Sequence, residues 1–179
     1  MQASPKPTAK DIERVIRNVP DFPKPGIQFK DITPVLADAK LFAASIDLLV
    51  GDFKPGMVDA VVGIDARGFI FAAAAALHLQ AGFVPVRKKG KLPYKAFEQE
   101  YALEYGTNTI AIHIDAVKPG SRVLLIDDLL ATGGTASAAA ALLNKVGAKI
   151  LEITFLIELS FLAGRDKLKG SPVRSLIVY

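Results

Sequence analysis

The sequence predicts an α/β fold with a central, mostly parallel sheet that is flanked by helices. Two observations support this prediction. The short apolar runs Ala60–Ile64 and Val123–Ile126 have the pattern of strands that are buried on both faces. Helical patterns follow each run, and strands that alternate with helices are typical of a parallel sheet. The 179 residues suit one domain, so we expect a single domain over residues 1–179.

Composition narrows the class of protein further. Hydrophobic residues make up 51% of the chain and charged residues 22%, which excludes disorder as its main state. The absence of cysteine excludes disulfides, iron–sulfur clusters, cysteine-ligated zinc and a cysteine nucleophile. The two histidines, His78 and His113, are too few for a histidine-rich metal site, and we expect both to be structural.

No segment has the pattern of a secretory signal or of a membrane span. The beginning of the chain lacks an apolar signal region, and the longest apolar stretch, Phe69–Leu77, has nine residues where a span needs about 20. We therefore expect a cytoplasmic protein that does not bind membranes. The net charge of +4 is mild for a nucleic-acid binder but suits a small, highly anionic substrate.

The first part of the chain is expected to form a helix and then a proline-rich loop. Thr8 and Asp11 make a capping-box variant, and apolar residues recur after them at helical spacing as far as Val19. The prolines and glycine of residues 20–26 then forbid a helix. We expect the loop to include Gly26–Asp31.

Asp38 is expected to cap a second helix, whose apolar residues continue to Leu49. The remaining patterns predict a turn at Lys54–Gly56, a strand at Ala60–Ile64, a helix at Phe69–Gln80, strands at Phe83–Val86, Gln99–Tyr105, Ile110–Ile114 and Val123–Ile126, a helix at Ala136–Val146 and a strand at Ile150–Leu159.

The residues after Val123–Ile126 are the first place to look for a site, because ligands of open α/β sheets bind beside the carboxyl ends of the strands. Asp127 and Asp128 follow directly, and we expect them outside the core because burying unpaired charge is costly. The next residues combine glycines, hydroxyls and a helix N-terminus, all suited to an anion: Ala131, Thr132, Gly133, Gly134 and Thr135. The pattern predicts a phosphorylated sugar. The alternative is a plain turn in which the aspartates act as caps.

The stretch VLLIDDLLATGGT (Val123–Thr135) resembles the phosphoribosyl pyrophosphate (PRPP) signature of the type I phosphoribosyltransferases. Four further stretches resemble the adenine-specific branch of that family: Phe22–Leu36, Gly63–Ala72, Val84–Pro93 and Glu100–Gly106. The resemblance implies the type I phosphoribosyltransferase fold, with a base-binding segment at about residues 20–36 and a flexible lid or hood at about residues 88–106. Phe161–Tyr179 matches only loosely, and its role stays open.

The resemblance also implies a reaction. The 5-phosphoribosyl group of PRPP is transferred to adenine, giving AMP and pyrophosphate, a step of purine salvage. Mg²⁺ is the implied cofactor, held mainly by substrate oxygens and water. A homodimer is implied as well. Two alternatives stay open: an enzyme for hypoxanthine or guanine, and a non-catalytic regulator that senses PRPP.

Roles for individual residues follow from the resemblance. Asp127 and Asp128 are expected to orient the ribose hydroxyls, and the glycine loop 131–135 to hold the 5′-phosphate with main-chain N–H groups. Glu104 is expected to assist proton movement on adenine, with Tyr105 beside it on the lid. The implied adenine-binding residues are Gln28, Phe29, Lys30, Leu129 and Leu159. From the residues alone, Phe29 could instead plug the core.

Pyrophosphate is expected at a second strand end and at the basic run that follows Val86. The implied contacts are Asp65, Ala66, Arg67, Gly68, Arg87 and Lys91, with Arg87 able to reach across a dimer interface. The alternative for Arg67 is a surface ion pair with Asp65, which contributes little. The run 87–91 lacks interleaved aromatic residues, so we expect no nucleic-acid partner.

Overall fold

In the computed structural model of the protein, residues 5–102 and 106–179 are described. The chain divides into two compact units, residues 1–48 and 49–179. Over the described ranges, no helix has both the length and the apolar character that crossing a membrane requires.

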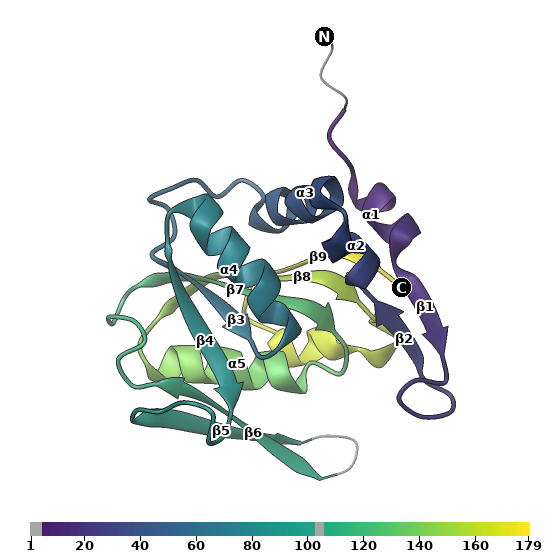
Figure 1. The fold of residues 1–179 in the computed structure, drawn as a ribbon. Helices are drawn as coiled ribbons and strands as arrows, with labels where there is room; N and C mark the ends of the chain where they lie inside the picture. Colours follow the sequence, from purple (N-terminus) through teal and green to yellow (C-terminus); the bar gives the residue numbers. More distant parts are fainter. Residues whose placement is uncertain (1–4, 103–105) are drawn as a thin grey trace. The chain divides into compact units, whose positions relative to one another are not determined.

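The first unit begins with helix α1 (Ala9–Val15) (Figure 1). An Asp11 carboxylate oxygen accepts hydrogen bonds from the backbone N–H and the hydroxyl of Thr8, at 2.9 and 2.7 Å. The predicted capping box is therefore confirmed. The predicted continuation of the helix to Val19 is wrong, because α1 ends at Val15.

The residues around the prolines form a small antiparallel sheet. Strand β1 (Arg17–Pro20) pairs with β2 (Gln28–Asp31), and Val19 lies opposite Phe29. The prediction of a loop over Gly26–Asp31 is therefore wrong for its last four residues. Proline biases the residue before it toward extended backbone, so Pro20 favours a strand where the apolar spacing had indicated a helix.

Two more helices follow, α2 (Thr33–Ala37) and α3 (Ala39–Val50). The Asp38 side chain accepts hydrogen bonds from the N–H groups of Lys40 and Leu41, at 2.8 and 3.0 Å. This contact satisfies amides at the start of α3 that have no partner within the helix, and it confirms the predicted cap.

The second unit contains a seven-stranded sheet with the order β5-β6-β4-β3-β7-β8-β9. Its strands are β3 (Ala60–Ile64), β4 (Gly82–Lys88), β5 (Ala96–Ala102), β6 (Thr107–His113), β7 (Arg122–Leu130), β8 (Lys149–Glu158) and β9 (Val173–Val178). Strands β4, β3, β7, β8 and β9 are parallel to their neighbours in that order. Strand β6 instead pairs antiparallel with β4 and β5. The mostly parallel sheet is as predicted.

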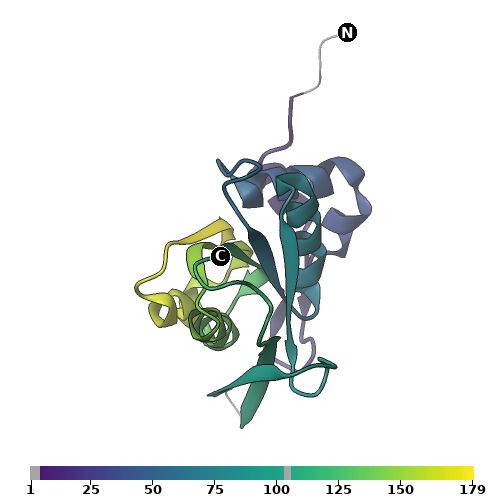
Figure 2. The same ribbon diagram turned by 90° about the vertical axis from the view of Figure 1, so that its left-hand side faces the viewer.

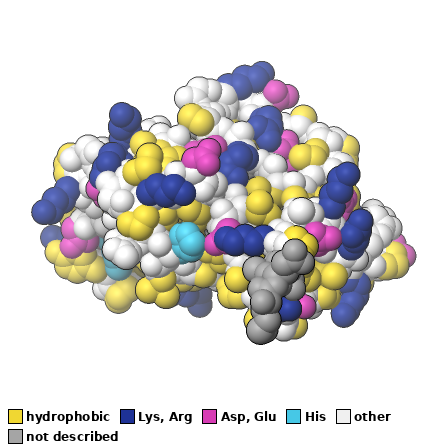
Figure 3. Space-filling model, turned by 90° about the horizontal axis from the view of Figure 1, so that it is seen from above, with side chains coloured by type: hydrophobic (Ala, Val, Ile, Leu, Met, Phe, Trp, Pro, Cys, Tyr) yellow, Lys and Arg dark blue, Asp and Glu magenta, His cyan; other side chains and the backbone are white. Residues whose placement is uncertain are grey.

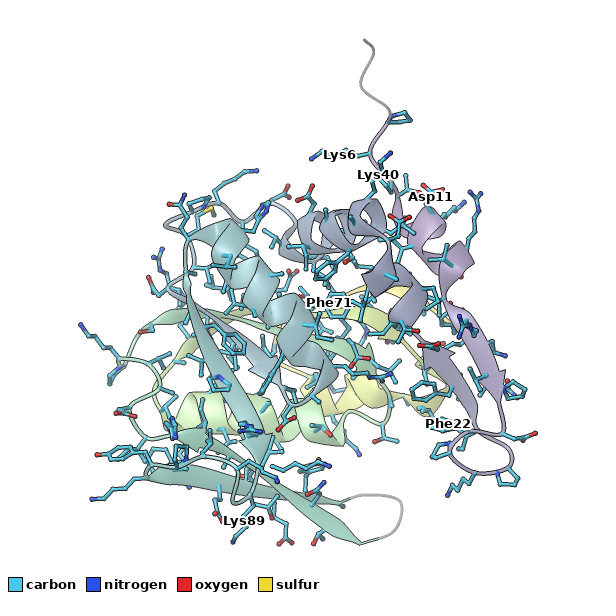
Figure 4. All side chains as sticks on the ribbon, in the orientation of Figure 1. Lys6, Asp11, Phe22, Lys40, Phe71 and Lys89 are labelled. Carbon is cyan, nitrogen blue, oxygen red and sulfur yellow. The ribbon has the colours of Figure 1, made fainter. Side chains whose placement is uncertain are left out.

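Helices α4 (Arg67–Leu79) and α5 (Gly134–Lys145) lie on opposite faces of this sheet (Figures 1 and 2). Phe71, on α4, is fully buried (Figure 4). On the other face, Leu142 and Leu143 of α5 pack into the core with Val62 and Leu125. Burial of these apolar faces stabilises the layered arrangement.

Several strands differ in their bounds from the prediction. β7 runs to Leu130 rather than Ile126, because β8 offers partners along the added residues, with Asp127 opposite Phe155 and Leu129 opposite Ile157. β5 begins at Ala96, so Ala96 and Phe97 belong to a strand paired with β6 and not to the expected lid loop. The pairing partner is a tertiary feature that single-strand patterns do not contain.

The last part of the chain completes the sheet. After β8 come two short 3₁₀ helices, η1 (Ser160–Leu162) and η2 (Gly164–Leu168), and then β9 at the edge of the sheet. Leu168 is buried in the core. Phe161–Tyr179, whose role was open from the sequence, is thus in part structural.

The sheet order places the predicted site loops together. β3 has β4 on one side and β7 on the other. The strand that follows β3 in the chain is thus added on one side of it, and β7 and the later strands are added on the other, so the order of the strands reverses at β3. Ligands of open α/β sheets bind at such a reversal, beside the carboxyl ends of the strands. The loops that leave β3 and β7 meet this condition.

Candidate active site

The end of β7 and the start of α5 line a pocket that is open to solvent, with about 330 Å³ of empty volume. It is lined by Asp127 and by residues 129–136. The first amides of α5 have no partner within the helix and carry its positive partial charge. The pocket is therefore suited to an anion, and it includes every residue of the predicted phosphate loop.

Gly133 gives this loop its shape. It precedes α5 with a φ of 76°, a conformation that side chains disfavour. A Cβ atom at this position would also overlap the carbonyl oxygen of Gly164. The loop therefore requires glycine at residue 133 for two independent reasons.

Asp128 differs from its prediction. It is 5% exposed on strand β7, so the expectation that neither aspartate would lie in the core is wrong for this residue. The guanidinium of Arg67, at the start of α4, lies 2.8 Å from Asp128 Oδ2 and compensates the buried charge. The alternative pairing of Arg67 with Asp65 is not what the structure forms.

Asp127 lines the pocket and lies close to the backbone of α4. Its Oδ1 accepts a hydrogen bond from the N–H of Asp128 at 2.9 Å. A Cβ atom on Gly68 would stand 2.5 Å from the same oxygen, so glycine at residue 68 leaves room for the carboxylate. Burial and the neighbouring charge of Asp128 raise the pKa of Asp127.

The predicted pyrophosphate residues are connected across the ends of β3 and β4. Arg87 donates from Nε to Asp65 Oδ2 at 3.0 Å and from Nη1 to the carbonyl of Lys91 at 3.0 Å. Ala66 and Arg67 begin α4 directly after Asp65. Two arginines thus gather near the loop that leaves β3, each held by an aspartate.

The basic residues do not form one continuous patch on the face in Figure 3, where Lys and Arg side chains alternate with acidic and apolar ones. Lys89, near the β5–β6 ribbon in Figure 4, pairs with Glu98 at 2.7 Å.

Two predicted adenine contacts lie beside the pocket. Leu129 lines it, and the N–H of Leu159, just after β8, donates to the carbonyl of Leu130 at 2.9 Å. Both leucines are partly exposed, so they can offer apolar surface to a ring.

The other predicted adenine contacts, Gln28, Phe29 and Lys30, lie on β2 of the first unit. The Gln28 side chain accepts a hydrogen bond from Asn18 at 2.7 Å. Phe29 is partly exposed and packs edge-on against Phe22, with ring centroids 5.1 Å apart. Glu104 and Tyr105 lie outside the described residues.

Among the described residues there is no cluster of three or more metal-ligating side chains. Asp127 is the carboxylate that lines the pocket, and the adjacent Asp128 is already engaged by Arg67. This donor set fits an ion whose ligands come mainly from a bound substrate and water.

Sequence reasoning missed two relationships at this site, the Arg67–Asp128 ion pair and the close approach of Gly164 to Gly133. Both join residues that are distant along the chain. The apolar pattern that predicts strands does not indicate which ends meet, so no local signal could have found them.

The fold, the glycine loop and the paired aspartates define a class of protein. The sequence model of the phosphoribosyl transferase domain family matches residues 28–174 of this chain. The chain therefore belongs to this family. It is 62% identical to the adenine phosphoribosyltransferase of Acidothermus cellulolyticus over 162 residues, which are 90% of this chain and 92% of that relative. Within the family, the chain belongs to the adenine phosphoribosyltransferases, which are transferase enzymes.

Solved structures give the same result. The adenine phosphoribosyltransferase of Rhodothermus marinus is 50% identical and superposes with a TM-score of 0.91, covering 96% of this chain and 98% of that one. The enzyme of Saccharomyces cerevisiae, complexed with an imino-altritol bisphosphate and adenine, is 41% identical with a TM-score of 0.89, covering 94% of this chain and 97% of that one. These similarities agree with the type I fold predicted from the sequence.

Proposed function

We propose that this chain transfers the 5-phosphoribosyl group from PRPP to adenine, giving AMP and pyrophosphate in purine salvage. The observation that carries the proposal is the anion-suited pocket at residues 129–136, which opens directly beside Asp127. The 5′-phosphate would bind the main-chain N–H groups of this loop. The yeast relative binds adenine, which supports the choice of base.

The two aspartates suit the chemistry of pyrophosphate departure. As the bond to the anomeric carbon breaks, positive charge develops on the sugar, as in glycoside hydrolysis. Carboxylates fixed beside that carbon favour the charge, and they can accept hydrogen bonds from the ribose hydroxyls. We assign both functions to Asp127 and Asp128.

Arg67 and Arg87 would bind the departing pyrophosphate, together with Lys91 and the loop Asp65–Gly68. Each guanidinium has five N–H donors, so an arginine that already holds an aspartate can still bind phosphate oxygens. Mg²⁺ would arrive coordinated mainly by PRPP and water and would neutralise charge on the leaving group.

Adenine would be held by main-chain groups near Gln28 and Lys30, with Phe29, Leu129 and Leu159 contributing apolar contacts. A backbone carbonyl facing the 6-amino group would be left unpaired by a 6-oxo purine, at a cost of about 1–3 kcal/mol. Glu104 would assist proton movement on the ring, and Tyr105 would lie beside it on the lid. For this assembly we propose one functional domain over residues 1–179 that forms a homodimer.

The test is an assay of the purified protein with PRPP, Mg²⁺ and, in parallel, adenine, hypoxanthine or guanine. We expect AMP and pyrophosphate with adenine, and at least tenfold lower kcat/KM with either 6-oxo base. A tenfold difference in kcat/KM corresponds to about 1.4 kcal/mol, which lies within the cost of leaving the backbone carbonyl unpaired. Preference for a 6-oxo base would overturn the assignment of adenine. No turnover combined with tight RNA or DNA binding would favour a PRPP-sensing regulator.

A further inference from the structure

We propose that Gly164 and Arg165, in the segment after β8, are positioning residues that hold the phosphate loop in its binding geometry. The proposal rests on the proposed function, because it assigns that loop to the 5′-phosphate. In Figure 1 the yellow turns of this segment lie beside one end of α5. Neither residue lines the pocket, so any effect on binding must act through the loop.

The backbone of Gly164 is in direct contact with the loop. A Cβ atom on Gly164 would overlap the carbonyl oxygen of Ala131 and stand 2.8 Å from the nitrogen of Gly133. In the reverse direction, a Cβ on Gly133 would overlap the carbonyl oxygen of Gly164. Two stretches of main chain therefore meet without a side chain between them, and the position of one fixes that of the other.

Arg165 ties this stretch of chain to the sheet. Its guanidinium donates to both carboxylate oxygens of Glu158, at 3.1 Å from Nε and 2.5 Å from Nη2. Nη1 donates to the carbonyl of Val173 at 2.8 Å. The arginine next to Gly164 is thus bonded to the end of β8 and to the start of β9.

The acceptor of this arginine is itself fixed. Glu158 is 6% exposed, and its Oε2 also accepts a hydrogen bond from the Ser175 hydroxyl at 2.6 Å. The Arg165 hydrogen bond lowers the pKa of Glu158, so the carboxylate is ionised at neutral pH. On the other side of Arg165, Leu168 anchors η2 in the core.

This rigidity matters because the loop would hold phosphate with backbone N–H groups. A side chain can rotate to follow a displaced ligand, whereas an amide can move only with its backbone. Misplacement by about 1 Å can cost on the order of 10²-fold in rate. The contact between Gly164 and the loop therefore sets where the phosphate, and with it the anomeric carbon, is held.

The test compares two site variants with two matched controls. Gly164→Ala places a methyl group against Ala131, and Arg165→Met removes the bonds to Glu158 and Val173. Gly82→Ala is the first control, since its Cβ would make only ordinary contacts, at 3.6 Å or more. Arg122→Met is the second control. Like Arg165, Arg122 donates two hydrogen bonds to one carboxylate, that of Asp59, and one to a backbone carbonyl, that of Gly56. It lies at the opposite end of β7, away from the phosphate loop.

For each variant we would measure Tm, kcat and the KM values for PRPP and adenine, and titrate ribose 5-phosphate by calorimetry. Both site variants should raise the KM for PRPP roughly 10- to 100-fold. The KM for adenine should stay within about twofold, and ribose 5-phosphate binding should weaken in parallel. Arg122→Met should lower Tm while leaving both KM values unchanged.

The inference is overturned if the site variants change the KM for PRPP no more than the controls do at comparable Tm. If Gly164→Ala does not fold, Arg165→Met and the milder Arg165→Lys, which keeps the charge but loses the bidentate geometry, decide the question. A wild-type protein that binds ribose 5-phosphate but forms no AMP would contradict the proposed function alone. The calorimetric comparison would then still test the positioning role.

Discussion

The guanidinium of Arg67 lies 2.8 Å from Oδ2 of Asp128 and joins the first residue of α4 to the last part of β7. Arg67 follows the carboxyl end of β3, and Asp128 lies near the carboxyl end of the neighbouring strand β7. The first strand end is assigned to pyrophosphate and the second to the ribose. The ion pair thus connects the two halves of the proposed PRPP site before any substrate is bound.

The first prediction concerns this pair. Arg67→Met should destabilise the protein and impair PRPP use, because the buried carboxylate of Asp128 then loses its compensating charge. A double-mutant cycle of this change with Asp128→Asn in urea should give a coupling energy of about 0.5–3 kcal/mol. Strict additivity of the two single changes would show that the pair does not stabilise the folded chain.

The second prediction concerns the pH dependence of Asp127. The pKa of this carboxyl is raised in the folded state by burial and by Asp128. Above the folded pKa the ionised, buried carboxylate therefore opposes folding, whereas below the unfolded pKa of about 3.9 it is protonated in both states and has no such effect.

Asp127→Asn should consequently make the protein without substrate more stable at pH 7, although it removes a functional group. The gain should shrink as the pH falls toward 4. Urea midpoints of the variant and the wild type at pH 7, 5 and 4 would measure it. A variant that is less stable than the wild type at pH 7 would contradict the assigned cause.

The third prediction tests the ribose assignment. The double change Asp127→Asn with Asp128→Asn should largely abolish PRPP binding, because asparagine keeps the shape but loses the two negative charges and half of the acceptor oxygens. Calorimetry with PRPP and Mg²⁺ measures this directly. Unchanged affinity in a folded variant would show that the acids do not contact the sugar.

The fourth prediction tests the proton-transfer role of Glu104. Glu104→Gln should slow turnover by roughly 10²–10⁴-fold, the usual contribution of one acid–base group. The matched control is Glu100→Gln, the same chemical change at an exposed position of β5. Steady-state rates that fall equally in both variants would remove Glu104 from the catalytic residues.

The fifth prediction concerns acid stability at the other end of β7. Hydrogen bonds from Arg122 lower the pKa of Asp59 from 3.8 to about 2. A carboxyl whose pKa is lower in the folded state than in the unfolded state stabilises the fold at any pH above its unfolded pKa. That contribution is lost as the pH falls through the folded pKa. Asp59→Asn should therefore be less stable than the wild type at pH 7, with a difference that narrows between pH 4 and pH 2. A constant difference across urea titrations in that range would contradict this.

The sequence alone determined the elements whose signals are local. Asp38 caps α3 because a short carboxylate reaches nearby amides, and Ala60–Ile64 is a fully buried strand as its apolar run indicates. The glycine loop after β7 was also recognisable, since close backbone approach and an adjacent helix N-terminus require particular residue types at fixed spacing.

The tertiary structure decided whatever depends on partners distant in the chain. β7 extends through Asp128 because β8 lies beside it, and the burial of that aspartate is tolerated because Arg67 reaches it from another strand end. The contact of Gly164 with Ala131 likewise joins two segments that are distant in the chain and meet only in the folded structure. Local patterns encode the conformation of each segment, whereas the pairing of distant charges and backbones follows from the order of the strands within the sheet.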